Sequence, residues 1–278
     1  MAAIITLTTD FGLADGCVAA MKGAILSINP EARLIDICHT IRPQAISEAA
    51  FVLGTAFEFF PRGTIHLAMV DPGVGTQRRA VILRTPVADF VAPDNGVLSY
   101  VLQKSSAKAV TGSQQAELGP ALEAVAITRP EFWRSPVSPT FHGRDIFAPV
   151  AAHLSLGHPP ADFGQQVTSL AMLPLSQPRR EPDGTLAGHV IHIDNFGNLI
   201  TDVRAGDLPR TAQAITIAAG SHTIAGLSRT YGEGKGLLAI IGSSGYLEIS
   251  FNEGSAVAFL DARLGDEVKI RLKLRDRP

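Results

Sequence analysis

The sequence IITLTTDFG, residues Ile4–Gly12, decides the fold of the first half of the chain. Its first six residues are apolar or β-branched, which predicts a buried strand, and the Asp-Phe-Gly that follows predicts a turn. A helix is expected from Cys17 to about Ile28, because Asn29-Pro30 would stop it. A second short strand is expected at Arg33–Cys38. Strand, helix and strand in this order are typical of a parallel βαβ unit.

The same alternation continues along the chain. Apolar residues recur at helical spacing from Ile46 to Phe60, which predicts an amphipathic helix, and a buried strand is expected at Thr64–Val70. Further strands are expected at Ala80–Arg84 and Phe90–Ala92. The pattern predicts an α/β domain with a mainly parallel sheet flanked by helices. Ligands bind such sheets at the carboxyl ends of the strands, where Asp10 and Asp71 fall.

The composition changes near residue 172, and prolines and glycine over 173–185 predict a linker. We expect an α/β domain over 1–172 and a second domain over 186–278. Short segments with strand character separated by turns predict that this second domain is an all-β, barrel-like structure. The strands are expected at Leu186–Asp194, Leu199–Arg204, Ala214–Ala218, His222–Ala225, Leu237–Ile241, Tyr246–Phe251 and Val268–Leu274, with one short helix at Ser255–Leu260.

Composition excludes several classes of protein. The 278 residues are 46% hydrophobic and 18% charged, so a sizeable core can form and disorder is not expected. A net charge of −2 gives no electrostatic footprint for nucleic acid or an anionic membrane. Two cysteines cannot build a disulfide scaffold. With no signal-peptide or membrane-spanning pattern, we expect a cytoplasmic protein.

Three segments of the first half could carry chemistry. Asp10, with Asp15 nearby, could bind a ribose diol or could simply cap a turn. In VDPGVGTQRR, residues 70–79, Asp71 and Arg78 could form a site, or a surface salt bridge worth about 0–1 kcal/mol. His142, in PTFHGRD, precedes an apparent helix start, although a lone histidine is more often structural. No Walker loop, no GxGxxG motif and no pattern of metal ligands is present, so no metal is expected.

Two segments of the second half are also candidates. Asp194, Phe196 and Asn198 could recognise a base or an ammonium group, or could form a β-turn. Ser243 and Ser244 could donate to a carboxylate, or could lie in a hairpin turn.

Taken together and in this order, the motifs resemble those of the S-adenosylmethionine hydrolases (SAM hydroxide adenosyltransferases), relatives of the fluorinating and chlorinating SAM enzymes. The resemblance covers nearly the whole chain. It rests on TTDFG at 8–12, VDPGVGT with Arg78, APDNG at 92–96, TFHGRD at 140–145, IDNFGN at 193–198 and SSGYLEI at 243–249.

The resemblance implies an N-terminal α/β domain, a C-terminal β-barrel domain and a homotrimer with SAM bound between neighbouring subunits. The family's catalytic Asp, Arg and His match Asp71, Arg78 and His142, with Arg78 chosen over the adjacent Arg79 by the motif alone. The implied substrate-binding residues cover four parts of SAM. Asp10 would bind the ribose, and Thr140 and Phe141 would lie near the reacting carbon. The methionine amine and carboxylate would be bound by Asp15, Asp194, Ser243 and Ser244, and the adenine by Phe196, Asn198 and, more loosely, Tyr231.

The implied reaction is attack of water or hydroxide on C5′ of SAM, which gives adenosine and L-methionine without a cofactor. Halide-using relatives carry a tyrosine where this chain has Asp71, and the fluorinating enzymes carry a serine where it has Gly143. Both differences favour water over halide. A SAM-dependent halogenase, a non-catalytic protein that binds an adenosyl ligand and a metal-dependent hydrolase are the alternatives.

Overall fold

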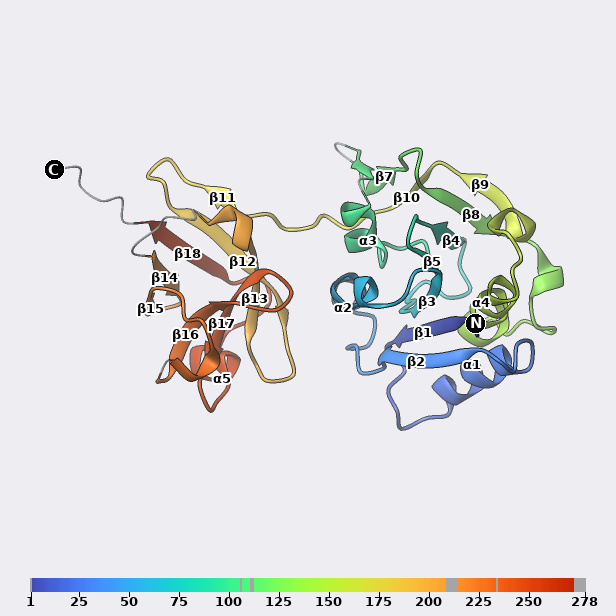
Figure 1. Cartoon of the computed structure of the whole chain (residues 1–278), viewed down its shortest axis with the longest axis horizontal. Coiled ribbons are helices and arrows are strands. Elements are labelled where there is room, and N and C mark those ends of the chain that lie inside the picture. The colour runs from blue at the N-terminus through green and yellow to red at the C-terminus, as the bar shows by residue number, and fades with distance from the viewer. Residues whose placement is uncertain (1, 106, 111–112, 209–214, 234, 273–278) are drawn as a thin grey trace. The chain divides into compact units, whose positions relative to one another are not determined.

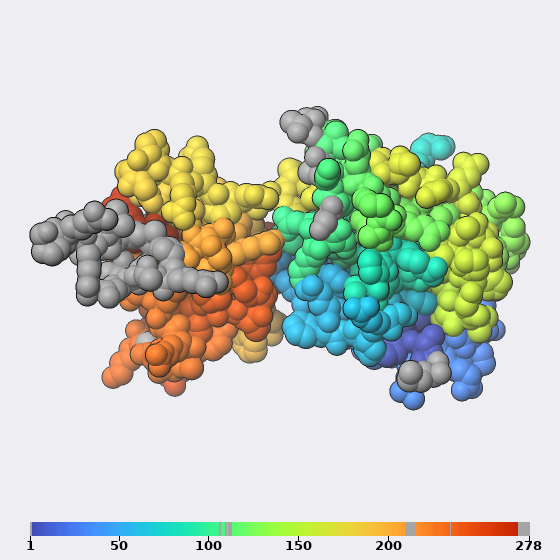
Figure 2. All heavy atoms as spheres, turned by 45° about the horizontal axis from the view of Figure 1, so that its top comes forward, coloured from blue at the N-terminus to red at the C-terminus, as the bar shows by residue number. Residues whose placement is uncertain are grey.

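The computed structural model describes residues 2–105, 107–110, 113–208, 215–233 and 235–272. The chain divides into two compact units, Met1–Pro174 and Leu175–Pro278 (Figure 1). Figure 2 colours the N-terminal unit from blue to yellow and the C-terminal unit from yellow to red. Within the described ranges, no helix is long and apolar enough to cross a membrane.

A seven-stranded sheet forms the centre of the N-terminal unit, in the order β2-β1-β3-β5-β4-β8-β9. The pairs β1/β2, β1/β3 and β3/β5 are parallel, whereas β4/β5, β4/β8 and β8/β9 are antiparallel. The predicted α/β class is therefore confirmed, with a sheet that is parallel on one side and mixed on the other. The strands are β1 Ile4–Thr9, β2 Arg33–Cys38, β3 Thr64–Met69, β4 Ala80–Arg84, β5 Ala88–Pro93, β8 Glu123–Ile127 and β9 Gly164–Val167.

Helices cover both faces of this sheet (Figure 1). On one face, α1 (Cys17–Leu26) and α4 (Ala148–Ser155) pack together over a core that includes Leu7 and Leu67. On the other face, α2 (Ile46–Ala56) and α3 (Ser99–Lys104) pack over residues such as Val81. Side chains of adjacent strand residues point to opposite faces, which is why continuous apolar strands serve both cores.

The sequence did not predict the short helices and strands between residue 98 and the linker. These include the 3-10 helices Pro130–Phe132 and Pro160–Phe163, and a three-stranded antiparallel sheet of β10 (Ser169–Ala171), β7 (Gln115–Glu117) and β6 (Lys108–Ala109). A five-residue π-helical turn, Gly143–Phe147, starts directly after His142 and runs into α4, so the helix start expected there is confirmed.

The C-terminal unit is an antiparallel sheet in the order β15-β14-β18-β12-β13-β17-β16, with β11 also pairing β12. Ser228 N donates to Ala239 O at 2.8 Å, linking the segment after β15 to β16 and bringing the two edges toward closure. The predicted all-β, barrel-like fold is confirmed. The elements are β11 Arg179–Arg180, β12 Leu186–Ile193, β13 Leu199–Arg204, β14 Ile215–Ala219, β15 His222–Ala225, β16 Leu237–Ile241, β17 Tyr246–Phe251, α5 Ala256–Leu260 and β18 Glu267–Leu272.

Two predicted strand ends lie outside the described residues, namely Ala214 and the pair 273–274. Short 3-10 turns occur at Ala205–Asp207 and Tyr231–Glu233. The short strand β11 falls within the segment that the sequence assigned to a linker, and it pairs with β12 through Arg179↔Ala187.

Strand register places the first candidate residues together. In the parallel pair β1/β3, Thr9 is opposite Met69. Asp10 and Asp71 follow these residues by one and two positions, so both lie at the carboxyl edge of the sheet, as the βαβ pattern predicted.

Candidate active site

A cleft of about 320 Å³ opens at the carboxyl ends of β1 and β3. Five of the residues singled out from the sequence line it, namely Asp10, Asp71, Thr140, Phe141 and His142. The lining is completed by Phe11, Pro43, Gln44, Met69, Pro72, Val74 and Gly143. Four segments from distant parts of the chain therefore meet around a single cavity.

Asp71, Arg78 and His142 are in contact beside this cleft. Arg78 Nε donates to Asp71 Oδ1 at 2.8 Å and to Oδ2 at 2.9 Å, and Nη2 also bonds Oδ2. Arg78 Nη2 lies 3.2 Å from His142 Nδ1. The side chains of Arg78 and Asp71 are only 12% and 3% exposed, so this is a buried ion pair and not the surface salt bridge that was the alternative. Arg78 does not itself line the cleft, but it contacts two residues that do.

The guanidinium fixes the state of the histidine. A guanidinium can only donate, so His142 Nδ1 accepts from Arg78, and a neutral ring then carries its proton on Nε2. Burial lowers the pKa of His142, and the adjacent Arg78 charge lowers it further, while Asp71 and Asp145 act in the opposite direction. The net pKa is below the ordinary 6.5, so the ring is neutral near pH 7.

Backbone geometry holds the loop after β3 and the segment before His142 against each other. Gly75 has φ +77°, and a Cβ at this position would lie 2.7 Å from Pro139 O, so both the conformation and the contact require glycine. Asp145, fully buried, accepts from Ser138 N at 2.8 Å and from Arg144 Nε at 2.6 Å. Burial raises the pKa of Asp145, but these hydrogen bonds outweigh it, and the net pKa lies below its usual value. Asp145 thus stays ionised and anchors the segment that carries His142.

The motif APDNG makes hydrogen bonds to residues next to Asp71 and Arg78. Asn95 Nδ2 donates to Val70 O at 2.9 Å, which fixes the backbone directly before Asp71. Arg79 Nε donates to Asp94 Oδ2 at 2.8 Å. The two adjacent arginines therefore have different partners, and it is Arg78 that reaches Asp71 and His142.

Asp10 is held by the loop that precedes α2. Its Oδ2 accepts from the backbone N of Gln44 at 2.8 Å, and Gln44 has φ +67°. The turn after Asp10 is fixed by His39, whose Nδ1 lies 2.9 Å from Thr9 Oγ1 and whose carbonyl accepts from Gly12 N at 2.8 Å. The carboxylate is therefore oriented before any ligand binds.

The remaining N-terminal candidates occupy different positions. Phe141 packs edge-on against Phe11 at 5.7 Å between ring centroids, forming an aromatic wall of the cleft. Thr140 is an exposed residue of the lining. Asp15 is exposed on the loop between β1 and α1 and does not line the cleft.

In the C-terminal unit, Asp194, Phe196 and Asn198 form one turn. Asp194 Oδ1 accepts from the backbone N of Phe196 and of Asn198, both at 2.9 Å, and Oδ2 accepts from Asn198 Nδ2 at 2.8 Å. The turn presents Phe196, which is 75% exposed. Gly197 N also donates to Asp194 O at 3.0 Å, so these residues form a β-turn that holds the Asp194 carboxylate in a fixed position.

Tyr231 lies near this turn. Its hydroxyl donates to Glu248 Oε1 at 2.7 Å. Burial, this hydrogen bond and the nearby charges of Glu248 and Asp194 raise the pKa of Tyr231 to about 12. Ser243 and Ser244 are exposed in the β16–β17 hairpin, as expected for a turn, and Gly242 before them packs against Glu248.

Sequence reasoning did not single out Gln44 or Glu248. Gln44 binds Asp10 through its backbone N and has an unusual φ, and neither feature can be recognised from the type of residue. Glu248 is buried, and its place in the motif SSGYLEI was the available signal. Across the described ranges, no group of three or more His, Cys, Asp or Glu side chains is arranged to hold a metal ion.

Comparison with known proteins adds independent information. Residues 5–164 match the SAM hydroxide adenosyltransferase N-terminal domain, and residues 188–269 match the corresponding C-terminal domain. A protein of Salinispora arenicola named (R)-S-adenosyl-L-methionine hydrolase is 37% identical over 96% of this chain and 97% of its own length. A Nocardia brasiliensis fluorinase is 28% identical over 97% of both chains.

Among solved structures, an uncharacterized conserved protein from Thermotoga maritima matches with a TM-score of 0.84 and 34% identity, covering 96% of this chain and 99% of its own. Both halves of the chain, its motifs and its fold thus agree with one group of proteins. The chain belongs to the SAM hydroxide adenosyltransferase family.

Proposed function

We propose that this protein hydrolyses S-adenosyl-L-methionine to adenosine and L-methionine. The observation that carries the proposal is the contact between Asp71, Arg78 and His142 beside a cleft that also contains Asp10. A relative of similar length bears the name of this activity. The family membership of both units supports the same conclusion.

The chemistry of the substrate determines what the site must supply. When an oxygen attacks C5′, the C5′–O bond forms, the C5′–S bond breaks, and its electron pair remains on sulfur. The sulfonium becomes a neutral thioether, so the leaving group needs no general acid. The difficult part is the nucleophile, because water is weak and a buried hydroxide is costly without a positive partner.

Arg78 is suited to hold that oxygen. Its Nε and Nη2 are already engaged with Asp71 and His142, which leaves Nη1 to donate to water or hydroxide. The fixed positive charge lowers the pKa of a bound water. Asp71 orients the guanidinium through two parallel hydrogen bonds.

His142 can take part in the proton transfer only after one change. Its Nδ1 accepts from Arg78 in the resting site. If binding of the oxygen at Nη1 moves Nη2 away from His142, Nδ1 becomes free, and the neutral ring can accept the proton that the water loses. Asp10 would bind the ribose diol, and Thr140 and Phe141 would align C5′ with the oxygen.

Two features disfavour a halide in this cleft. The Asp71 carboxylate lines it and would repel a halide, whereas a water molecule enters uncharged and loses its proton only in the site. A Cβ at Gly143 would lie 3.1 Å from Met69 Cγ and 3.3 Å from Met21 Sδ, so a serine here would have to displace both side chains. Incubation with SAM and chloride should give no 5′-chloro-5′-deoxyadenosine. Its formation would establish the halogenase alternative.

We also propose a cytoplasmic homotrimer in which the C-terminal unit of a neighbouring subunit contributes Asp194, Phe196, Asn198, Tyr231 and the Ser243–Ser244 turn to SAM binding, with Asp15 near the methionine amine. Light scattering should then give three times the chain mass of 29.4 kDa.

The activity itself is tested by chromatography of the purified protein after incubation with SAM. Equal amounts of adenosine and methionine support hydrolysis, whereas binding without methionine release would indicate a non-catalytic protein.

A further inference from the structure

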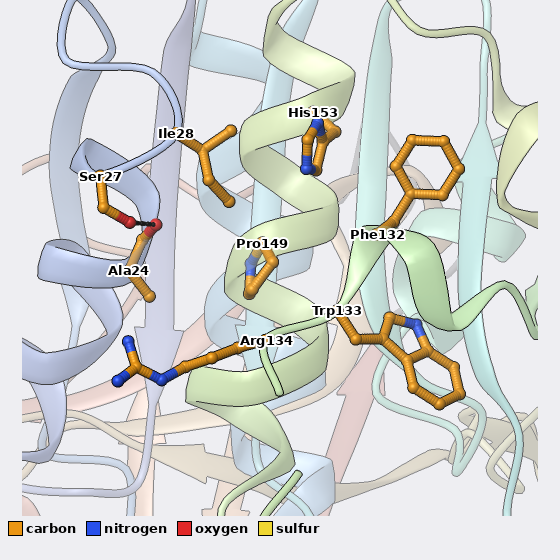
Figure 3. Close-up of a pocket in the computed structure, with 8 residues that line it drawn as sticks. All are labelled: Ala24, Ser27, Ile28, Phe132, Trp133, Arg134, Pro149 and His153. Atoms are coloured by element: carbon orange, nitrogen blue, oxygen red, sulfur yellow. Dashed lines mark hydrogen bonds between the residues drawn. The ribbon is translucent and has the colours of Figure 1, made fainter. Parts of the chain in front are cut away.

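A second pocket of about 270 Å³ lies in the N-terminal unit (Figure 3). It is formed by the end of α1, the segment after the 3-10 helix Pro130–Phe132, and α4. Ile28 and Phe132 provide apolar walls, and Arg134 extends across one end with its guanidinium beside α1 (Figure 3). None of its lining residues lines the catalytic cleft.

Two of the lining residues, a histidine and a tryptophan, carry ring nitrogens that the pocket does not expose. His153 Nδ1 and Trp133 Nε1 are both buried, and neither has a hydrogen-bond partner among the described residues. Figure 3 shows the His153 ring between Ile28 and Phe132, at the opposite end of the pocket from Arg134.

The charge of the pocket is positive at one end and neutral at the other. Burial lowers the pKa of His153, and the nearby His158 lowers it further, so the ring is uncharged near pH 7. Arg134 Nε is 3.9 Å from Asp145, whose carboxylate is already bound by Arg144 at 2.6 Å, so the Arg134 guanidinium is only weakly paired. Its side chain is 59% exposed and can reach a ligand.

We propose that this pocket binds a small monocarboxylate with an apolar, ring-sized body. The carboxylate would pair with Arg134, which matches it as a bidentate fork. The body would lie in the apolar part of the pocket, against Ile28, Phe132 and Pro149. A cavity of roughly 150 Å³ can hold benzene, so 270 Å³ accommodates a ring and a short chain.

The test uses the only tryptophan of the chain, Trp133, which lines this pocket. Titration of the full-length protein with 3-phenylpropionate should change its fluorescence with saturation. The Arg134→Gln variant should bind the probe about tenfold more weakly or worse, and the uncharged 3-phenylpropanol should lose a similar factor. Arg129→Gln is the matched control, since Arg129 is also 59% exposed, pairs with Glu131 and does not line the pocket.

Three results would overturn the proposal: no saturable change up to the solubility limit of the probe, equal affinity in Arg134→Gln, or displacement of the probe by adenosine. The last result would assign the probe to the catalytic cleft. Because binding is read from Trp133 and not from turnover, the outcome is independent of the proposed hydrolysis.

Discussion

Replacement of Arg78 by glutamine separates the structural from the chemical contribution of the ion pair. Asp71 is 3% exposed and is bound through both oxygens by Arg78. Removing the guanidinium leaves a buried, unpaired carboxylate, which typically costs about 3–5 kcal/mol. Since domains are stable by only about 5–15 kcal/mol, urea unfolding should detect this loss clearly. The double variant Asp71→Asn/Arg78→Gln removes the unpaired charge and should recover most of the stability.

Activity should behave differently from stability. A preorganised donor that stabilises an oxyanion contributes roughly 10²–10³ in kcat, and we expect at least that loss when Arg78 no longer holds the nucleophile. The stabilised double variant should remain as inactive as Arg78→Gln, while still binding SAM. The adjacent Arg79 is the matched control, because it pairs with Asp94 and is 39% exposed. Arg79→Gln should lose less than about tenfold, since it breaks no contact to the proposed nucleophile.

The assay is the release of adenosine and methionine under saturating SAM, with urea unfolding measured on the same preparations. Wild-type turnover in Arg78→Gln would refute the assignment of the nucleophile to its guanidinium. Recovery of activity together with stability in the double variant would show that Arg78 serves only to hold the fold.

Three further predictions concern His142, Asn95 and dependence on a metal. The pKa of His142 is below 6.5, and only its neutral form can accept the hydrogen bond from Arg78. We therefore expect kcat to fall only at pH values under 6.5. A pH–rate profile with its acid midpoint above 6.5 would contradict this. Asn95→Ala removes the hydrogen bond to Val70 O, so it should lower kcat with little change in KM. The same change should reduce the unfolding free energy by about 1 kcal/mol. An unchanged kcat in steady-state assays would leave Asn95 without a positioning role. Exhaustive chelation should leave turnover intact, since the neutral leaving group requires no Lewis acid; loss of activity that is restored by a divalent cation would favour the metal-dependent alternative.

Periodicity and turn residues were sufficient for the first ninety or so residues. The helix predicted from Cys17 ends at Leu26, two residues early, and the one predicted from Ile46 continues beyond Ala56 as a 3-10 turn at Phe57–Phe59. Both differences lie at helix ends, where local hydrogen bonding and not periodicity decides the boundary. The antiparallel strands β8 and β9 were not predicted, because EAVAI of β8 is rich in alanine and GQQV of β9 has a single β-branched residue, so neither resembles a typical strand.

The site was predicted unevenly for physical reasons. Strand ends identified Asp10 and Asp71, because parallel strands bring their carboxyl ends to one edge. The meeting of Arg78 with His142, 64 positions apart, could not follow from spacing and came from the family resemblance. The role of Gln44 depends on its φ of +67°, which side-chain type does not determine.

The central claim is that an oxygen from water displaces methionine by attack on C5′ of SAM. Its most direct test is hydrolysis of SAM in water enriched in ¹⁸O, with mass spectrometry of both products. The account predicts one ¹⁸O atom in the 5′-hydroxyl of adenosine and none in methionine. Unlabelled adenosine, or a product other than adenosine and methionine, would contradict it.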